Sequence, residues 1–414
     1  MSGRGLIALA ASALAAPGLA QWQSDLGACA RASLSPEQRI EACSRTLRAD
    51  GVPAPDRATA YNNLGVAWKA KGDLDQAIAN YDRAIALAPR LANAYNNRGA
   101  ALGAKGDLDA AIRDFDHAIE LDARLAKAHE YRSLALQSRG DLGGATRDLD
   151  EAIKLEPERA ELFVFRGLLL DRQGDTTRSI ADYDEAIRLN PGFAPAYNNR
   201  CNTWLIKEAY DQAAADCTVA LKLDPELAQA HFNRGVLWVV ANDFAKAKVE
   251  FDEAIRLKPE FAPAYKSRAT LNFYSGQFDA AQADLTRAAS LLHSDPYVAI
   301  WRYLAQARGG HAESAAKELA QSVSGDGQPV WPGPVIELYL ARGDPGSVFK
   351  AAQHGDGRTQ SDRQCEAAFY VGEWHLLRGE NAQALRLFED AQRNCRRSFS
   401  ESGGARAELD RIAH

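Results

Sequence analysis

Residues 58–91 read ATAYNNLGVAWKAKGDLDQAIANYDRAIALAPRL, and residues 92–125 read ANAYNNRGAALGAKGDLDAAIRDFDHAIELDARL. The two stretches match position by position over 34 residues, and columns of small residues keep this step along the chain. One column holds Gly65, Gly99, Ser133, Gly167, Cys201, Gly235 and Ala269, and another holds Ala84, Ala118, Ala152, Ala186, Ala220, Ala254 and Ala288. A helix-turn-helix unit of this length cannot bury its apolar face alone, so successive units stack into one core. The sequence therefore predicts an all-α solenoid with seven tandem repeats over residues 58–295.

The side chains within each repeat indicate which kind of helical hairpin it is. The repeats have an aromatic residue or His at position 4, small residues at positions 8 and 20, and Ala at position 27, when they are numbered from Ala58, Ala92, Ala126, Ala160, Ala194, Ala228 and Ala262. Position 32 is proline in five repeats: Pro89, Pro157, Pro191, Pro225 and Pro259. Proline ends a helix because it cannot donate to the helical ladder and restricts the residue before it. This pattern resembles the tetratricopeptide repeat (TPR) family, which implies two closely packed helices, A and B, in each repeat.

The turns between helices A and B repeat a Gly-Asp pair. It occurs as Gly72-Asp73, Gly106-Asp107, Gly140-Asp141 and Gly174-Asp175. Glycine suits the left-handed end of helix A, and the aspartate caps the start of helix B. Glu208 and Asn242 replace the glycine in repeats five and six. Asparagine tolerates the left-handed conformation, so we expect an altered turn only at Glu208.

The chain outside the repeats is less regular. Residues 1–20 combine Arg4, a short apolar run and small residues before Gln21. This pattern predicts a cleaved signal peptide rather than a membrane span, and with it a periplasmic or secreted protein of bacterial type. A lipid anchor at Cys29 is not expected, because polar residues separate it from the apolar run. We expect capping helices at residues 21–57, a degenerate eighth repeat at 296–323, an irregular insertion with short helices at 324–364, and a TPR-like hairpin with a capping helix at 365–414.

Composition and charge narrow the classes of partner. Charged residues make up 25% and hydrophobic residues 46% of the chain, and the net charge is −6. Nucleic-acid binding needs clustered Lys and Arg, and the sequence shows no basic stripe. No Cys/His cluster has zinc spacing, so neither a metal nor another cofactor is expected.

The six cysteines take specific places in the repeat frame. Cys201 and Cys217 occupy positions 8 and 24 of repeat five, which face each other across the A–B contact, and Cys43 resembles another position 24, with Cys29 14 residues before it. Cys365 and Cys395 fall at one end of the C-terminal hairpin. This frame selects the disulfides 29–43, 201–217 and 365–395, which imply an oxidising compartment. The alternative is six buried free thiols, since cysteine is often a small core residue.

Arginine and acidic residues recur together 16 positions apart. The pairs are Arg98 and Asp114, Arg132 and Asp148, Arg166 and Asp182, Arg200 and Asp216, Arg234 and Glu250, Arg268 and Asp284, and Arg302 and Glu318. Repeat one lacks both members, with Leu64 and Asn80 in their places. Because presence and absence agree within each repeat, we expect a ladder of structural ion pairs within repeats. An arginine row that grips an acidic ligand is the alternative.

Function in such an array is expected on the concave face lined by helix A. Asn63, Asn97, Asn199 and Asn233 stand at position 6, and this resembles the asparagine ladders by which some TPR proteins hold a peptide backbone. Apolar residues follow on the same stripe, and Phe165, Phe232, Val236 and Phe273 are the predicted anchors. A solvated polar face is the alternative for the asparagines. The Lys/Asn/Arg clamp of chaperone-binding TPR domains is not matched.

The C-terminal part carries a second resemblance. The order of repeats, a Trp331-Pro332 insertion, short helices and the stretch Cys365–Gly372 resembles the bacterial periplasmic TPR adaptor family of NlpI. That resemblance implies scaffolding of a protease or of peptidoglycan hydrolases. This chain departs from the family by lacking a well-placed lipidation box and by having more repeats.

Taken together, the patterns predict a non-enzymatic exported scaffold that binds proteins or peptides in its concave groove, and they leave a homodimer open. No GxSxG, P-loop or HExxH motif occurs, and His129 and His231 fill the aromatic position 4. The alternative is a TPR-linked enzyme or enzyme-regulatory subunit in which the repeats recognise the substrate.

Overall fold

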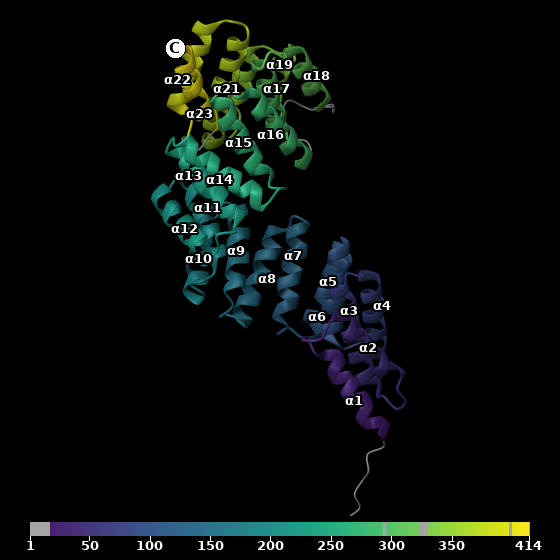
Figure 1. The fold of residues 1–414 in the computed structure, drawn as a ribbon. Helices are drawn as coiled ribbons and strands as arrows, with labels where there is room; N and C mark the ends of the chain where they lie inside the picture. The colour runs from purple at the N-terminus through teal and green to yellow at the C-terminus, as the bar shows by residue number, and fades with distance from the viewer. Residues whose placement is uncertain (1–16, 293–294, 323–329, 397–399, 414) are drawn as a thin grey trace, which may run out of the picture. The chain divides into compact units, whose positions relative to one another are not determined.

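The computed structural model describes residues 17–292, 295–322, 330–396 and 400–413, and these residues form helices joined by turns, without strands. The expected signal peptide lies largely outside the described residues, and the expected cleavage point after Ala20 falls within the first helix. The chain forms two compact units, Met1–Pro191 and Gly192–His414. Within each unit, antiparallel helices stack one after another, as predicted for an α-solenoid (Figure 1).

The first unit contains the N-terminal helices and four repeats. Its helices are α1 (Pro17–Ala30), α2 (Pro36–Arg48), α3 (Ala54–Lys71), α4 (Leu74–Leu87), α5 (Ala92–Lys105), α6 (Leu108–Leu121), α7 (Ala126–Ser138), α8 (Leu142–Leu155), α9 (Ala160–Arg172) and α10 (Thr176–Leu189). Each A helix packs on its own B helix, and α5 also contacts the A helices before and after it, α3 and α7. The A helices α3, α5 and α7 therefore form a continuous helix-A surface.

The second unit continues the repeats and ends in a helical cap. The repeat helices are α11 (Ala194–Ile206), α12 (Tyr210–Leu223), α13 (Ala228–Val240), α14 (Phe244–Leu257), α15 (Ala262–Tyr274), α16 (Phe278–Leu291), α17 (Pro296–Arg308) and α18 (Ala312–Ser322). The cap consists of α19 (Gly333–Tyr339), α20 (Pro345–Ala352), α21 (Gly357–Leu377), α22 (Asn381–Asn394) and α23 (Ser400–Ala413). Helix α21 begins at Gly357, so the boundary expected at residue 365 lies inside a helix.

Small residues let the helices of each repeat approach closely. A Cβ atom built on Gly99 would lie 2.8 Å from the Phe115 ring, and one on Gly167 would lie 2.6 Å from the Tyr183 ring. Phe115 and Tyr183 are both almost completely buried. The turns also follow the pattern, because Gly72 has φ 88° and Glu208 has φ 60°. The expectation of an altered turn at Glu208 was wrong, since this residue adopts the left-handed conformation that glycine has elsewhere.

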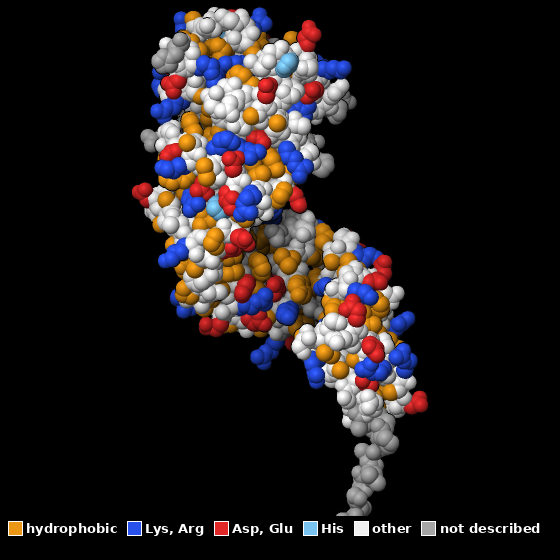
Figure 2. Space-filling model, viewed as in Figure 1, with side chains coloured by type: hydrophobic (Ala, Val, Ile, Leu, Met, Phe, Trp, Pro, Cys, Tyr) orange, Lys and Arg blue, Asp and Glu red, His pale blue; other side chains and the backbone are white. Residues whose placement is uncertain are grey.

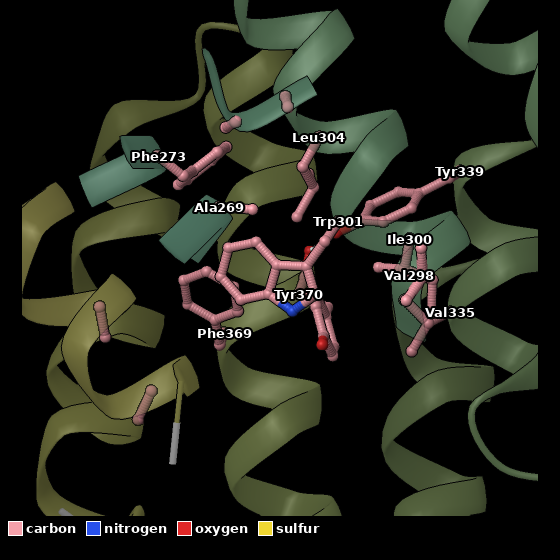
Figure 3. Close-up of a cluster of buried hydrophobic side chains, with 14 of the residues drawn as sticks. Ala269, Phe273, Val298, Ile300, Trp301, Leu304, Val335, Tyr339, Phe369 and Tyr370 are labelled. Atoms are coloured by element: carbon pink, nitrogen blue, oxygen red, sulfur yellow. Dashed lines mark hydrogen bonds between the residues drawn. The ribbon is translucent and has the colours of Figure 1, made fainter. Parts of the chain in front are cut away.

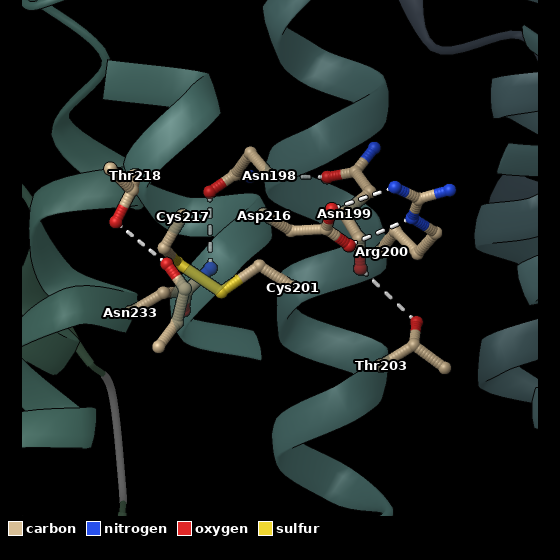
Figure 4. Close-up of a disulfide and its surroundings, with 10 residues drawn as sticks. Asn198, Asn199, Arg200, Cys201, Thr203, Asp216, Cys217, Thr218 and Asn233 are labelled. Carbon is tan, nitrogen blue, oxygen red and sulfur yellow. Dashed lines mark hydrogen bonds and ion pairs between the residues drawn. A yellow bond between two sulfur atoms is a disulfide. The ribbon is translucent and has the colours of Figure 1, made fainter. Parts of the chain in front are cut away.

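All six cysteines form disulfides in the pairing that the repeat frame selects: Cys29–Cys43, Cys201–Cys217 and Cys365–Cys395. The Cys201–Cys217 bond takes the place of the glycine–aromatic contact at positions 8 and 24 of other repeats (Figure 4). Both cysteines are completely buried. This disulfide therefore joins helices A and B of repeat five at their closest approach.

Replacing Cys201 and Cys217 together by alanine should lower the free energy of unfolding by about 3 kcal/mol, as expected for a cross-link that closes a loop of this length. The pair Cys201→Gly and Cys217→Phe copies the contact of Gly99 and Phe115 and should recover most of the loss. Urea unfolding measures both variants, and non-reducing peptide mapping checks the pairing. Equal losses for the two double variants would contradict the assigned packing.

The arginine–carboxylate ladder is present, and it extends further than the sequence predicts. Arg166 donates through Nε and Nη2 to the two carboxylate oxygens of Asp182, at 2.9 and 2.6 Å. Its Nη1 donates at 2.8 Å to Asp150, in the preceding repeat. The same third contact joins Arg98 to Asp82, Arg132 to Asp116 and Arg268 to Asp252. These arginines therefore connect neighbouring repeats as well as the two helices of one repeat.

The other predicted pairs are also in contact. Arg200 is bidentate to Asp216, Arg234 contacts Glu250, and Arg302 contacts Glu318. Thr218 stands where repeats one to three and repeat six have the aspartate that accepts from Nη1 of the following arginine. In the repeat after Thr218, the buried Nε of Arg234 has no hydrogen-bond partner among the described residues. The hydrogen bonds that Arg166 donates to Asp182 raise the pKa of Arg166, so its charge is permanent. This geometry favours the structural role of the ladder over an acidic-ligand site.

Candidate functional site

The position-6 asparagines do not stand free on the helix-A surface. Asn97 donates through Nδ2 to Oδ1 of Asn62 at 2.9 Å, and Asn233 donates to Oδ1 of Asn198 at 3.0 Å. Each bond joins one A helix to the A helix of the preceding repeat, and Figure 4 shows the second of them. Asn97 and Asn233 therefore each link their repeat to the preceding one.

The hypothesis of an open asparagine ladder needs correction at Asn233. Its side chain is buried, with 5% exposure for the residue. Asn63, Asn97 and Asn199 are half-buried. The amide of Asn62 donates to Asn63 at 3.5 Å, and the amide of Asn198 donates to Asn199 at 3.2 Å. Because a buried amide needs a partner, these side chains bond to one another before any ligand arrives.

Replacing Asn233 by alanine should lower the free energy of unfolding by about 1–3 kcal/mol, because it leaves the buried Oδ1 of Asn198 without its donor. Asn202→Ala is the matched control, since Asn202 is exposed on the preceding A helix. Thermal and urea unfolding measure both variants. An unchanged melting temperature for Asn233→Ala would show that the bond between repeats contributes nothing.

Three of the predicted apolar anchors are partly accessible to solvent, and the fourth is buried in the core. Phe165 in the first unit and Val236 in the second are half-buried. Phe232 is half-buried against Phe251 and Phe261, with ring centroids 5.7 and 5.3 Å away.

Phe273 was wrongly predicted to face the groove. It is 1% exposed and packs edge-on against Phe278 and Trp301, at 5.2 and 5.3 Å between ring centroids. Figure 3 shows it in a buried cluster with Trp301, Phe369 and Tyr370. The cap helices α21 and α23 contribute to this cluster, so the helix-A surface of repeat seven is covered there.

In the first unit, an apolar patch remains open on the helix-A surface. It consists of Tyr131 and Leu134 on α7 and Phe165 and Leu168 on α9, at positions 6 and 9 of repeats three and four. Leu134 is 42% and Leu168 is 39% exposed, and both rank among the exposed large hydrophobic residues of the described chain. Leu168 belongs to the apolar stretch that the sequence assigns to the groove, whereas Leu134 was not predicted. The repeat frame could have shown Leu134, because Val66 and Ala100 are smaller at the same position.

The surroundings of this patch are partly charged. Leu134, Phe165 and Leu168 line a shallow hollow of about 30 Å³. At its edge, Glu130 is buried and bonded to Arg159, with 2.8 Å from Nη1 to Oε2. Lys69 from repeat one lies with Nζ 5.8 Å from the Tyr131 ring centroid, and burial lowers the pKa of Lys69. The patch therefore offers apolar contact area beside a partly desolvated ammonium group.

Comparison with known families identifies the repeats. Residues 69–106 match a family model described as TPR repeat, and residues 92–124 and 132–192 match models described as tetratricopeptide repeat. The protein therefore contains TPR repeats and has the TPR α-solenoid fold. No curated protein matches the sequence.

Two solved structures with TM-scores of 0.50 and above agree on this fold. A tetratricopeptide repeat protein from Parabacteroides merdae is similar with a TM-score of 0.52 and 17% identity, over 60% of this chain and 98% of that one. The human IFIT1 dimer with m7Gppp-AAAA is similar with a TM-score of 0.50 and 15% identity, over 86% of each chain. YrrB, described as a TPR protein with an unusual peptide-binding site, has a TM-score of 0.37 and 23% identity, over 44% of this chain and 95% of that one. At these identities the likeness concerns the fold alone, and no support emerges for the resemblance to NlpI.

The visible face carries both positively and negatively charged side chains. Figure 2 shows basic and acidic side chains interspersed on the visible face, with apolar side chains between them. No helix in the described part of the chain is both long and apolar enough to cross a membrane.

Proposed function

We propose that this protein is an exported, non-enzymatic scaffold whose apolar patch on repeats three and four binds a segment of a partner protein. The observation that carries the proposal is the exposure of Leu134 and Leu168 on neighbouring A helices, beside Tyr131 and Phe165. Exposed apolar groups that cluster in this way are typical of interaction sites. A few buried aromatic and aliphatic contacts usually dominate the binding energy.

The geometry of the patch defines what the partner segment must offer. Packed helices lie about 8–10 Å apart, which spans about three residues of an extended peptide or two turns of a helix. The segment would place apolar side chains on Leu134 and Leu168 at that spacing. Lys69 favours a carboxylate near the end that lies beside Tyr131, since an ammonium group that is partly desolvated gains from a negative partner.

The disulfides support export. Three disulfides in a chain of this length are typical of proteins that mature in an oxidising compartment. Cell-envelope complexes with a protease or a peptidoglycan hydrolase are one setting that the sequence resemblance suggests. Cell fractionation of the producing organism tests this part, and recovery of the reduced protein only in the cytosol would contradict it.

Site-specific photo-crosslinking tests the patch itself. A benzoylphenylalanine placed at Leu134 or Leu168 should crosslink to a partner in intact cells, and mass spectrometry should locate the bound segment. Leu87 is the matched control, because it is 41% exposed but lies at the end of the B helix α4. The same group placed at Trp331 probes the C-terminal insertion. Crosslinks formed only from Leu87, or only from Trp331, would place partner binding elsewhere and contradict the proposal.

A further inference from the structure

The C-terminal helix α23 lies on the helix-A surface of repeat seven. Arg411 donates through Nη2 to the carbonyl oxygens of Phe273 and Tyr274, at 3.3 and 2.9 Å. At the other end of α23, the Tyr274 hydroxyl donates to the carbonyl oxygen of Ser400. Helix α23 therefore spans the end of α15 and occupies the surface that the sequence assigns to a ligand.

The contact between α23 and the surface beneath it is close. A Cβ atom on Gly404 would lie 2.6 Å from the Phe369 ring, and one on Gly403 would lie 2.8 Å from the Tyr274 ring. Gly404 is buried and Phe369 is completely buried. Adjacent glycines disfavour a helix, and an isolated helix of about this length is marginal in water. Helix α23 therefore owes its order to docking.

Two pairs of carboxyl groups lie between α23 and α21. Glu401 and Glu408 on α23 are seven residues apart, and so are Glu366 and Glu373 on α21. Glu373, Glu401 and Glu408 are buried, and Glu366 is half-buried. Seven residues make about two helical turns, so the two glutamates of each helix lie on one face. On the facing sides of the two helices, Glu366 is then paired with Glu401 and Glu373 with Glu408.

The pair of Glu373 and Glu408 is partly neutralised. Nη1 of Arg308, on α17, lies 2.9 Å from Glu373 and 3.0 Å from Glu408, and Arg411 also contacts Glu408. On α19, burial raises the pKa of the Tyr339 hydroxyl, and the negative charge of Glu373 adds to this shift. Burial and the neighbouring Glu408 raise the pKa of Glu373 to about 8.

The pair of Glu366 and Glu401 accepts hydrogen bonds from uncharged side chains. Tyr297 and Trp331 donate to Glu366 at 2.9 and 2.5 Å, and Tyr370 donates to Glu401 at 2.6 Å. Among the described residues, no Lys or Arg forms an ion pair with either carboxylate. Asp362 also faces Glu366 but is itself paired with Arg396, and Tyr274 lies on the α15 side of Glu401. Burial and Glu401 raise the pKa of Glu366 to about 7.

We propose that the surface formed by α15 and α21 is a helix-binding site that the chain's own α23 fills at acidic pH and leaves as the pH rises. Two acids that face each other in a buried contact share protons when docked and lose them when apart. The protein with α23 docked then binds more protons than the protein with α23 released, at pH values between the ordinary glutamate pKa and the raised pKa of Glu366 and Glu373 on α21. Docking therefore weakens as the pH rises through that window.

The size of the effect follows from the same linkage. Complete return of Glu366 from a pKa of about 7 to the ordinary value of about 4.3 on release would weaken docking about 30-fold between pH 5.5 and 8.5. Tyr297 and Trp331 stay beside Glu366 when α23 leaves, so about 30-fold is the upper bound for this group. Ionisation of Glu373 adds to this in the same direction. The release concerns the second unit, so its outcome is separate from partner binding at the apolar patch in the first unit.

Hydrogen exchange measured by mass spectrometry on the full-length protein tests the proposal. Protection factors, corrected for the intrinsic exchange rate at each pH, should fall at least about fivefold in residues 400–413 between pH 5.5 and 8.5. Helix α4 is the internal control and should keep its protection. In the double variant Glu366→Gln and Glu373→Gln, the change in residues 400–413 should be less than about threefold, because both groups with raised pKa are gone.

A second variant checks that the measurement reports docking. Gly404→Ala should release α23 at both pH values, because its methyl group meets the Phe369 ring. Full protection of residues 400–413 in this variant would contradict the close contact. Unchanged protection in the wild-type protein, or an equal pH response in the double glutamine variant, would overturn the proposal.

Discussion

Replacing Trp301 by alanine should lower the free energy of unfolding of the second unit by about 4 kcal/mol. Trp301 is 1% exposed and lies at the centre of the largest buried cluster (Figure 3). Its ring stacks on Phe369 at 5.4 Å and meets Phe273 edge-on at 5.3 Å. Removal of so large a buried ring leaves a cavity that surrounding helices cannot fill by collapse.

The variant Trp301→Phe distinguishes the contribution of ring packing from that of the indole N–H group. The indole Nε1 is buried and has no hydrogen-bond partner among the described residues. Phenylalanine keeps part of the ring volume and removes this unpaired donor, so we expect a loss below about 2 kcal/mol. Urea unfolding followed by circular dichroism measures both variants. Equal losses for alanine and phenylalanine would show that ring packing does not dominate at this site.

Arg166→Ala should cost about 3 kcal/mol, the lower end of the range for a broken buried ion pair. The Arg166 side chain is 19% exposed, whereas its partner Asp182 is 8% exposed. Removal of the guanidinium leaves a nearly buried carboxylate with its charge uncompensated. The loss should shrink as the pH falls, because protonation of Asp182 then removes that charge.

The double variant Arg166→Leu and Asp182→Asn copies Leu64 and Asn80 of repeat one and should recover much of the loss. Asp150 also loses its contact to Arg166, but its side chain is 36% exposed and can be solvated. A double variant as unstable as the sum of the two single variants would contradict the pairing.

Much of the fold was predictable because the repeat fixes which positions meet. Positions 8 and 24 face each other in every repeat, and for that reason the Cys201–Cys217 bond followed from spacing alone. The pairing of Arg166 with Asp182 followed in the same way. The additional contact to Asp150 was missed although the signal was present, since aspartate recurs at position 25 in the repeats that make this contact.

The functional surface was less predictable, because coverage depends on distant segments. Phe273 and Trp301 occupy helix-A positions, yet α21 and α23 bury them from far along the chain without repeat spacing. The burial of Asn233 has a cause within the repeats, because its partner Asn198 lies 35 residues earlier, one residue more than the repeat length. A helical pattern places a residue on a face, but only the structure shows which faces remain open.

The binding affinity of the crosslinked partner segment tests the central claim most directly. Fluorescence anisotropy with a labelled synthetic copy of that segment should give an affinity for Leu134→Asp/Leu168→Asp at least about 100-fold weaker than for the wild-type protein, since two apolar anchors are replaced by charges. Leu87→Asp should bind within about twofold of the wild-type protein, because Leu87 has the same exposure but lies outside the patch. All three proteins should melt at similar temperatures. Wild-type affinity in the double variant would contradict partner binding at repeats three and four.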